Sequence, residues 1–182
     1  TPPYGWMNDP NGFSYFDGEY HLFYQYNPYD IKWGPMHWGH AKSKDFVDWE
    51  RLPVALAPDD EIKGQCFSGT AIVEGDKHTL IYTLHNDDKE EQAVAIGDGT
   101  EYKCISNEAA IKTEDLPEGF SGVDFRDPKI WKEDDIYYCI VSAKNDEGLG
   151  TILLFESNDL LEWKYVGVLF ENDGNYGKMW EC

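Results

Sequence analysis

Positive charge is scarce in this sequence. Its 182 residues include 15 Lys and Arg against 35 Asp and Glu, for a formal net charge of −20. Nucleic acids and anionic membrane surfaces both bind through basic patches, so the composition speaks against both as partners. No apolar run approaches the roughly 20 residues of a membrane-spanning helix, and no signal peptide is visible.

Cysteine is also sparse, and its spacing carries no metal motif. Cys66, Cys104, Cys139 and Cys182 lie far apart without a C-x-x-C pair, which argues against a disulfide framework or a zinc site. Cys139 lies in the strand-like run 137–141 and is expected to be a small core residue. We therefore expect reduced thiols and a cytoplasmic location. A glycine-rich phosphate loop and a convincing amphipathic helix are missing too.

Short strand-like patterns, rich in aromatics, dominate instead and recur with a long period. Asp17-Gly18 separates two aromatic runs, which is a strong hairpin signal. The turns before Tyr20, His78 and Tyr137 are almost evenly spaced, and a Ser-x-Asp-x-x-acid-Trp pattern occurs at 43–49 and again at 157–163. Four short strands per unit at such a period predict an all-β fold, a β-propeller. A β-sandwich also supplies short strands, but it does not explain so long a period.

The repeat sets the expected domain organisation. We expect blade 1 at about 6–58, blade 2 at about 64–108, blade 3 at about 123–170, and the start of blade 4 at about 178–182. Repeat units cannot bury their faces alone, and open blades leave strand edges unpaired. We therefore expect the chain to be a piece of a longer protein. The strands are expected at 13–16, 20–26, 36–42, 50–52, 67–73, 78–84, 92–96, near 102, and at 129–131, 136–142, 151–156 and 163–165.

Polar residues recur at one position of the repeat. Ser68 lies midway between Asp9 and Asp127 in the chain, and Glu181 follows Asp127 after a similar interval. The innermost strands of successive blades line the central channel of a propeller. We therefore expect these four side chains to meet at the mouth of one funnel. Two carboxylates with a third in support are what cleavage of a glycosidic bond needs.

The motifs that contain these residues carry a resemblance. Trp6-Met7-Asn8-Asp9-Pro10-Asn11-Gly12, Phe67-Ser68-Gly69, Phe125-Arg126-Asp127-Pro128 and Glu181-Cys182 resemble glycoside hydrolase family 32 from end to end of the chain. The family comprises invertases and other β-fructofuranosidases, which are five-bladed propellers followed by a β-sandwich. The segments 34–41 and 52–68 look most like the bacterial sucrose and sucrose-6-phosphate hydrolases. The resemblance implies a sugar substrate and no cofactor.

The resemblance also implies the role of each matching residue. Asp9 would be the nucleophile and Glu181 the general acid and then base, while Asp127 would stabilise the transition state with Arg126 beside it. Further family positions that line the fructose subsite match Asn8, Gln25, Trp33, Phe67 and Ser68. A retaining mechanism predicts carboxyl groups of Asp9 and Glu181 about 5 to 5.5 Å apart. Glu181 should have a raised pKa through the like charge of Asp127, and Arg126 should hold Asp127 ionised.

Other readings stay open. A fructan hydrolase, a fructosyltransferase and a non-catalytic sugar-binding propeller would share most of these residues, although a binder need not keep all three carboxylates. His37 and His40 would point to opposite faces of a strand, so we expect no metal site. Trp33 and Trp38 could each pack in the core. Glu90-Glu91 and Glu114-Asp115 are expected to be solvated, and the 182-residue chain on its own to have little or no activity.

Overall fold

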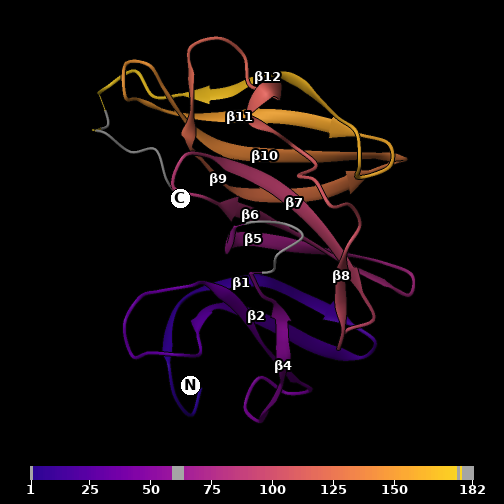
Figure 1. Cartoon of the computed structure of the whole chain (residues 1–182). Coiled ribbons are helices and arrows are strands. Elements are labelled where there is room, and N and C mark those ends of the chain that lie inside the picture. The colour runs from indigo at the N-terminus through magenta and orange to yellow at the C-terminus, as the bar shows by residue number, and fades with distance from the viewer. Residues whose placement is uncertain (1, 59–63, 176, 178–182) are drawn as a thin grey trace.

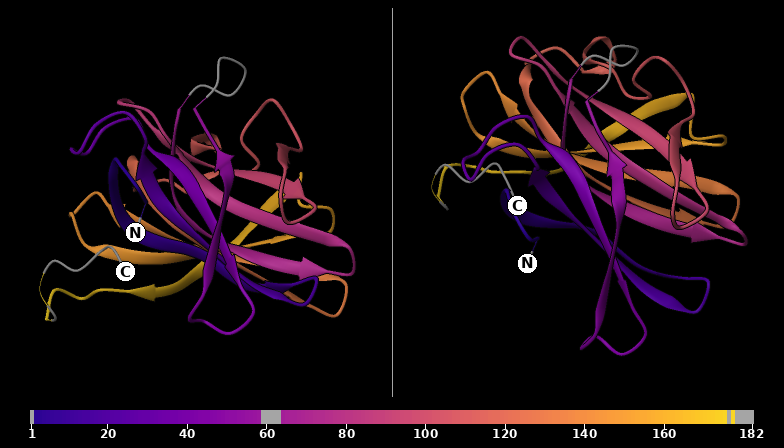
Figure 2. Two further views of the ribbon diagram at one scale, coloured as in Figure 1. Left: turned by 90° about the horizontal axis from the view of Figure 1, so that it is seen from below. Right: turned by 60° about the horizontal axis from the view of Figure 1, so that its bottom comes forward.

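Three four-stranded antiparallel sheets make up the structure, a computed structural model that describes residues 2–58, 64–175 and 177. Figure 1 shows the three sheets one above the other in chain order, and Figure 2 shows the same sheets from two further sides. Each sheet is built from four strands consecutive in the sequence, so every connection within a sheet is between neighbours. This is the all-β blade organisation that the repeat predicts.

The first sheet has the order β1-β2-β3-β4. Its strands are β1 (Trp6–Phe16), β2 (Glu19–Asn27), β3 (His37–Ser43) and β4 (Trp49–Leu56). The turn between β1 and β2 has positive φ at both Asp17 and Gly18, as a two-residue hairpin turn of type I′ requires.

The second sheet contains β5 (Gln65–Glu74), β6 (Lys77–His85), β7 (Glu90–Gly97) and β8 (Tyr102–Cys104). Its last strand is short, and a 3₁₀ turn, η1 (Thr113–Asp115), follows in the connection to the third sheet. This turn is the only helical element in the part of the chain that the structure describes.

The third sheet contains β9 (Phe120–Glu133), β10 (Ile136–Asn145), β11 (Gly150–Ser157) and β12 (Trp163–Glu171). Strands β1 and β9 begin well before the expected positions, because the Asp-Pro motifs lie within the strands rather than ahead of them. Proline lacks the N–H of a ladder bond and is tolerated there because both strands are sheet edges.

Two apolar clusters join the sheets, and alternation along β6 separates them. Leu80 and Tyr82 face the first sheet and pack in the cluster that contains Phe23 and Trp38. Ile81 faces the third sheet and packs in the cluster that contains Phe125. Successive side chains of a strand point to opposite faces, so the middle sheet is apolar on both faces.

The first strands of the three sheets are brought together by this packing. Strand β5 lies between β1 and β9 and packs against both. Residues one period apart on these strands therefore become neighbours in space, as the repeat predicts.

Three histidines are buried between the first and second sheets. His21 Nδ1 lies 2.9 Å from His40 Nε2, and His78 lies 2.8 Å from both the Ser14 hydroxyl and the Tyr102 hydroxyl. Burial lowers the pKa of His40 to about 3 and that of His78 to about 4, and it lowers the pKa of His21 as well. The three rings are therefore neutral at pH 7.

The repeated Ser-x-Asp-x-x-acid-Trp pattern forms the same turn twice. In the first copy, Asp45 Oδ1 accepts the backbone N–H groups of Val47 and Asp48, and the Trp49 indole donates to the Phe46 carbonyl. Asp159 and Trp163 make the equivalent bonds in the third sheet. The match between the two segments is thus confirmed in three dimensions.

Candidate active site

The first strand of each sheet (β1, β5 and β9, here called the inner strands) carries a β-bulge at the residue that the repeat singles out. In β1, Met7 pairs with Tyr26 and Pro10 with Tyr24, so Asn8 and Asp9 oppose the single residue Gln25. A bulge leaves one residue unpaired and turns its side chain away from the regular alternation.

The other two inner strands carry similar bulges, and the one in β9 is shifted by one residue relative to the repeat. In β5 the bulged residues are Phe67 and Ser68, which oppose Thr83. In β9 the bulged residues are Asp127 and Pro128, which oppose Val141. The period in the sequence therefore corresponds to a repeated local irregularity, and the three irregularities face one another.

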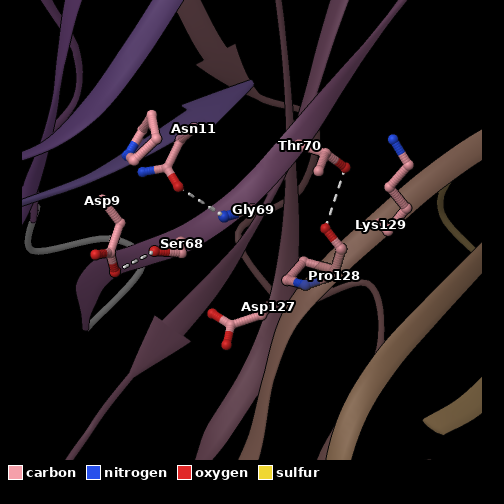
Figure 3. Close-up of a pocket in the computed structure, with 9 residues that line it drawn as sticks. Asp9, Asn11, Ser68, Gly69, Thr70, Asp127, Pro128 and Lys129 are labelled. Carbon is pink, nitrogen blue, oxygen red and sulfur yellow. Dashed lines mark hydrogen bonds between the residues drawn. The ribbon is translucent and has the colours of Figure 1, made fainter. Parts of the chain in front are cut away.

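Asp9, Ser68 and Asp127 line one cavity of about 690 Å³ between the inner strands. The Ser68 hydroxyl donates to Asp9 Oδ2 at 3.3 Å and so joins two inner strands (Figure 3). Further along the cavity, the Thr70 hydroxyl donates to the Pro128 carbonyl at 3.1 Å and accepts from the Ile130 N–H at 3.0 Å. These bonds tie β5 to its two neighbours.

A smaller, adjoining cavity of about 270 Å³ gathers the candidate residues. Its lining includes every candidate that the sequence analysis singled out within the described ranges: Asn8, Asp9, Gln25, Trp33, Phe67, Ser68, Arg126 and Asp127. They come from all three sheets and from the loop between β2 and β3. Glu181, the remaining candidate, lies outside the described residues, so its predicted separation from Asp9 stays a prediction.

Aromatic rings form one wall of the smaller cavity. Phe67 is stacked on His85, with ring centroids 4.1 Å apart and planes within 5°. Trp33 approaches Phe67 edge-on at 6.2 Å and is 54% exposed. An exposed ring beside a polar cavity is suited to contact with the apolar face of a sugar. Trp38, in contrast, is fully buried and donates its indole N–H to the Phe67 carbonyl.

Two amide candidates are already bonded to the protein. Gln25 is buried and donates Nε2 to the Cys66 carbonyl at 2.9 Å, which links the first sheet to the second. The side-chain oxygen of Asn8, Oδ1, accepts the Trp6 indole N–H at 2.8 Å. Both amides are therefore fixed in orientation beside the cavity.

Glu90 and Glu91 are not solvated, which corrects the sequence-based expectation. Glu90 is completely buried, and its Oε1 accepts Arg126 Nη1 at 2.9 Å and lies 2.9 Å from His85 Nδ1. Glu91 is 8% exposed and accepts the N–H of Thr113. The expectation was wrong because a local run of charge says nothing about partners that arrive from the next sheet.

Arg126 also has acidic partners that sequence reasoning missed. Its Nη1 donates to Glu90 and its Nη2 lies 3.5 Å from Asp124 Oδ1, while Lys144 pairs with the other Asp124 oxygen at 3.0 Å. The signal that could have found Glu90 is its place just before the apolar run of β7, but that signal is weak.

No metal or membrane feature accompanies the site. Across residues 2–58, 64–175 and 177, no group of three or more His, Cys, Asp or Glu side chains is arranged to hold a metal ion. Within the same ranges no helix has the length and apolar character to cross a bilayer.

Comparison with known proteins gives consistent matches over the chain. Residues 1–182 match the family model described as glycosyl hydrolases family 32 N-terminal domain. The chain is 44% identical to the sucrose-6-phosphate hydrolase of Escherichia coli, over 100% of this chain and 39% of that protein. It is 41% identical to the levanase of Bacillus subtilis, over 100% of this chain and 27% of that protein.

Solved structures agree with the sequence matches. A β-fructofuranosidase of this family from Bombyx mori matches with a TM-score of 0.87 at 44% identity, covering 100% of this chain and 39% of that one. Fructan 1-exohydrolase IIa from Cichorium intybus, in complex with 1-kestose, matches with a TM-score of 0.83 at 34% identity, over 94% of this chain and 34% of that one. The chain thus spans well under half the length of these relatives.

Proposed function

The chain belongs to glycoside hydrolase family 32, and from this premise we propose that the full-length protein is a retaining β-fructofuranosidase. Its substrate would be sucrose or sucrose-6-phosphate, cleaved at the non-reducing fructosyl end without a cofactor. Sucrose-6-phosphate hydrolases and a raffinose invertase are among the relatives that match the whole chain. The five-bladed closure and the blade bounds near 6–58, 64–108 and 123–170 are part of the same proposal.

Asp9 is the proposed nucleophile. Its Oδ2 accepts the Ser68 hydroxyl, which fixes the carboxylate in direction. The opposite oxygen, Oδ1, would attack the anomeric carbon of the fructosyl unit and form a covalent intermediate. Holding a reacting group in this way lowers the entropic part of the barrier.

Glu181 and Asp127 complete the proposed mechanism. Glu181 would protonate the leaving oxygen and then activate the water that releases fructose. Asp127 would accept hydrogen bonds from the fructose hydroxyls, which strengthen as positive charge develops on the ring. Phe67 and Trp33 would supply the apolar wall of the subsite.

One observation supports this proposal most. The residues chosen from the sequence motifs and family positions line a single cavity of about 270 Å³, although up to two repeats of the chain separate them. Residues placed only for packing would not be expected to converge on one polar hollow. The convergence includes two of the three proposed catalytic carboxylates.

A fructan hydrolase is the second candidate. The levanase of Bacillus subtilis matches the whole chain at 41% identity, close to the value for the sucrose-6-phosphate hydrolases. The fructosyl subsite would be shared, and the difference would lie in what holds the leaving group.

The test is fructose release from sucrose, sucrose-6-phosphate and inulin by the full-length gene product. Asp9→Asn should lower kcat by at least about a thousandfold, because a carboxamide cannot form the covalent intermediate. Asp17→Asn is the matched control, since it removes the same charge from an exposed turn of the same hairpin and Asn tolerates positive φ.

The outcomes separate the candidates. Preference for a sucrose substrate supports the proposal, and preference for inulin favours the second candidate. Sugar binding without hydrolysis would favour a non-catalytic binding protein. With methanol as acceptor, retention yields the methyl β-fructofuranoside, and the α product would refute the double displacement. Activity that survives Asp9→Asn would refute the assignment of the nucleophile.

A further inference from the structure

The segment that contains Asp127 is held by three fully buried side chains of the neighbouring sheet. Thr83 on β6, and Glu90 and Gln92 on β7, are each 0% exposed. All three bond to residues 125–127 of β9. Polar groups with no exposure are costly unless they are fully bonded, so these bonds constrain both partners.

Thr83 contacts Asp127 itself. Its hydroxyl oxygen accepts the Asp127 backbone N–H at 3.1 Å and its proton is donated to Gln92 Oε1 at 2.7 Å. The donor role toward Gln92 orients the lone pairs of the hydroxyl toward Asp127. Gln92 then donates Nε2 to the Phe125 carbonyl at 2.8 Å, so the two side chains bracket the segment.

Glu90 holds the two residues that precede Asp127 in the chain. One carboxylate oxygen, Oε2, accepts the Phe125 N–H at 2.9 Å, and the other accepts Arg126 Nη1 at 2.9 Å. Bonds to an ionised carboxylate are among the strongest in proteins. Glu90 Oε1 also contacts His85, whose ring stacks on Phe67, and Phe67 lines the smaller cavity.

The backbone at Asp127 requires such support. Its φ is +63°, a left-handed conformation that residues with a Cβ rarely adopt. Conformations of this kind persist where the surroundings determine them, and they concentrate at functional sites. The bulge at 127–128 leaves Asp127 without a paired residue on β10, and its backbone N–H bonds to the Thr83 hydroxyl.

The preceding interface offers a comparison. There Gln25 donates to the carbonyl of Cys66, the residue one repeat before Phe125, and Trp38 donates to the carbonyl of Phe67. Carbonyls at equivalent positions are thus held in both interfaces. At the second interface a hydroxyl and a buried carboxylate also take the backbone N–H groups.

We propose that Thr83, Glu90 and Gln92 are positioning residues that set the place and direction of the Asp127 carboxylate. The proposal rests on the proposed function, in which Asp127 stabilises the transition state. The three residues act through Asp127 and Arg126 and do not touch the substrate. Their contribution is therefore expected in kcat more than in KM, since Asp127 bonds strengthen in the transition state.

The test compares threonine variants in the full-length gene product. Thr83→Val keeps the shape of the side chain and removes both hydrogen bonds, and it should lower kcat about 10- to 100-fold with KM changed less than about threefold. Thr83→Ser restores the hydroxyl and should recover kcat to within about threefold. Thr151→Val is the matched control, because the Thr151 hydroxyl is buried and has no hydrogen-bond partner among the described residues.

A double-mutant cycle separates positioning from folding. If Thr83 acts through Asp127, Thr83→Val should lower the residual kcat of Asp127→Asn by less than about threefold. Glu90→Gln keeps the shape of the side chain and removes its charge, and as a single substitution it should lower kcat at least about tenfold. Combined with Asp127→Asn, it should lower the residual kcat by much less. Hydrogen exchange of the Asp127 amide should be faster in Thr83→Val and unchanged in Thr83→Ser.

Several outcomes would overturn the proposal. Provided that the wild type releases fructose, the proposal fails if Thr83→Val leaves kcat unchanged or alters only KM. It also fails if Thr83→Val lowers kcat by the same factor in the Asp127→Asn background as in the wild type. A wild type that releases no fructose from any β-fructofuranoside would overturn the proposed function first, and the positioning role with it.

Discussion

Acidification should weaken the interface between the first and second sheets, because His21, His40 and His78 are buried there without charge. The unfolded chain takes up a proton on each ring near pH 6.5, whereas the folded protein does so at about pH 3 for His40 and about pH 4 for His78. Stability contributed by the neutral rings is fully present above pH 6.5 and is lost as the pH falls toward the folded pKa values.

The magnitude follows from the two shifts. At pH 5 both rings are still neutral in the folded protein, and the pH lies about 1.5 units below the unfolded pKa, which corresponds to about 2 kcal/mol per ring at about 1.36 kcal/mol per unit. The pair should therefore lower the free energy of unfolding by about 4 kcal/mol between pH 7.5 and pH 5. That is a large part of the total stability of a typical domain, which is on the order of 10 kcal/mol.

The assay is urea unfolding of the full-length gene product, followed by tryptophan fluorescence at steps between pH 7.5 and pH 5. Most carboxylates remain ionised throughout this window, so the histidines dominate the change. His40→Phe keeps an aromatic ring beside Phe23 and Tyr102, and it should lower stability at both ends of the range. It should also reduce the pH-dependent loss by about half, because one of two strongly shifted groups is gone.

Two results would refute the reasoning. A free energy of unfolding that changes by less than about 1 kcal/mol over the window would mean that the rings are solvated or already charged in the folded state. An undiminished pH dependence in His40→Phe would mean that the effect arises elsewhere.

Three further predictions concern packing and reactivity. Thr70→Val removes the bonds that join β5 to Pro128 and Ile130 and should lower the free energy of unfolding by about 1 to 3 kcal/mol, measured by urea unfolding; an equal stability would show that the two strands are held by apolar contacts alone. Asp45→Ala should lower the urea midpoint of unfolding slightly, because the N–H groups of Val47 and Asp48 lose their acceptor in an exposed turn, and an unchanged midpoint would show that water replaces the carboxylate. Cys139 should not react with iodoacetamide at pH 8 until urea unfolds the protein, since complete burial raises the pKa of its thiol; labelling of Cys139 in the folded protein would contradict its burial.

The sequence allowed the blade repeat and the site to be predicted because both are written in the same period. Strand pairs separated by Asp-Gly or acidic turns are local signals, and the turns at Asp45 and Asp159 repeat them residue by residue. Asp9, Ser68 and Asp127 share one offset, so their meeting needs only the assumption that blades stack in order. The structure brings them to one cavity for this reason.

The bulges could not be predicted from the period. A shared period places residues at equivalent points of successive blades, but it does not reveal that two residues oppose one at each point. The segment 8–12 was expected ahead of the strand at 13–16, since its composition is typical of a turn. On an edge strand the ladder bond that proline lacks costs little. The bulge at each Asp-Pro segment interrupts the regular alternation of side chains, and the Asp side chain lines the cavity.

The supports of the site follow no common period, and this explains why Glu90 was misplaced. The Cys66 carbonyl accepts from Gln25, which lies on β2, the second strand of the first sheet. The corresponding Phe125 carbonyl accepts from Gln92, which lies on β7, the third strand of the second sheet. What repeats is the acceptor, while the donor can come from any side chain that reaches it. A buried carboxylate such as Glu90 is then recognisable only from its partner Arg126, which lies far along the chain and in another sheet. Periodicity can therefore locate residues that meet at one cavity of such a fold, but the residues that hold them in place follow from three-dimensional contacts.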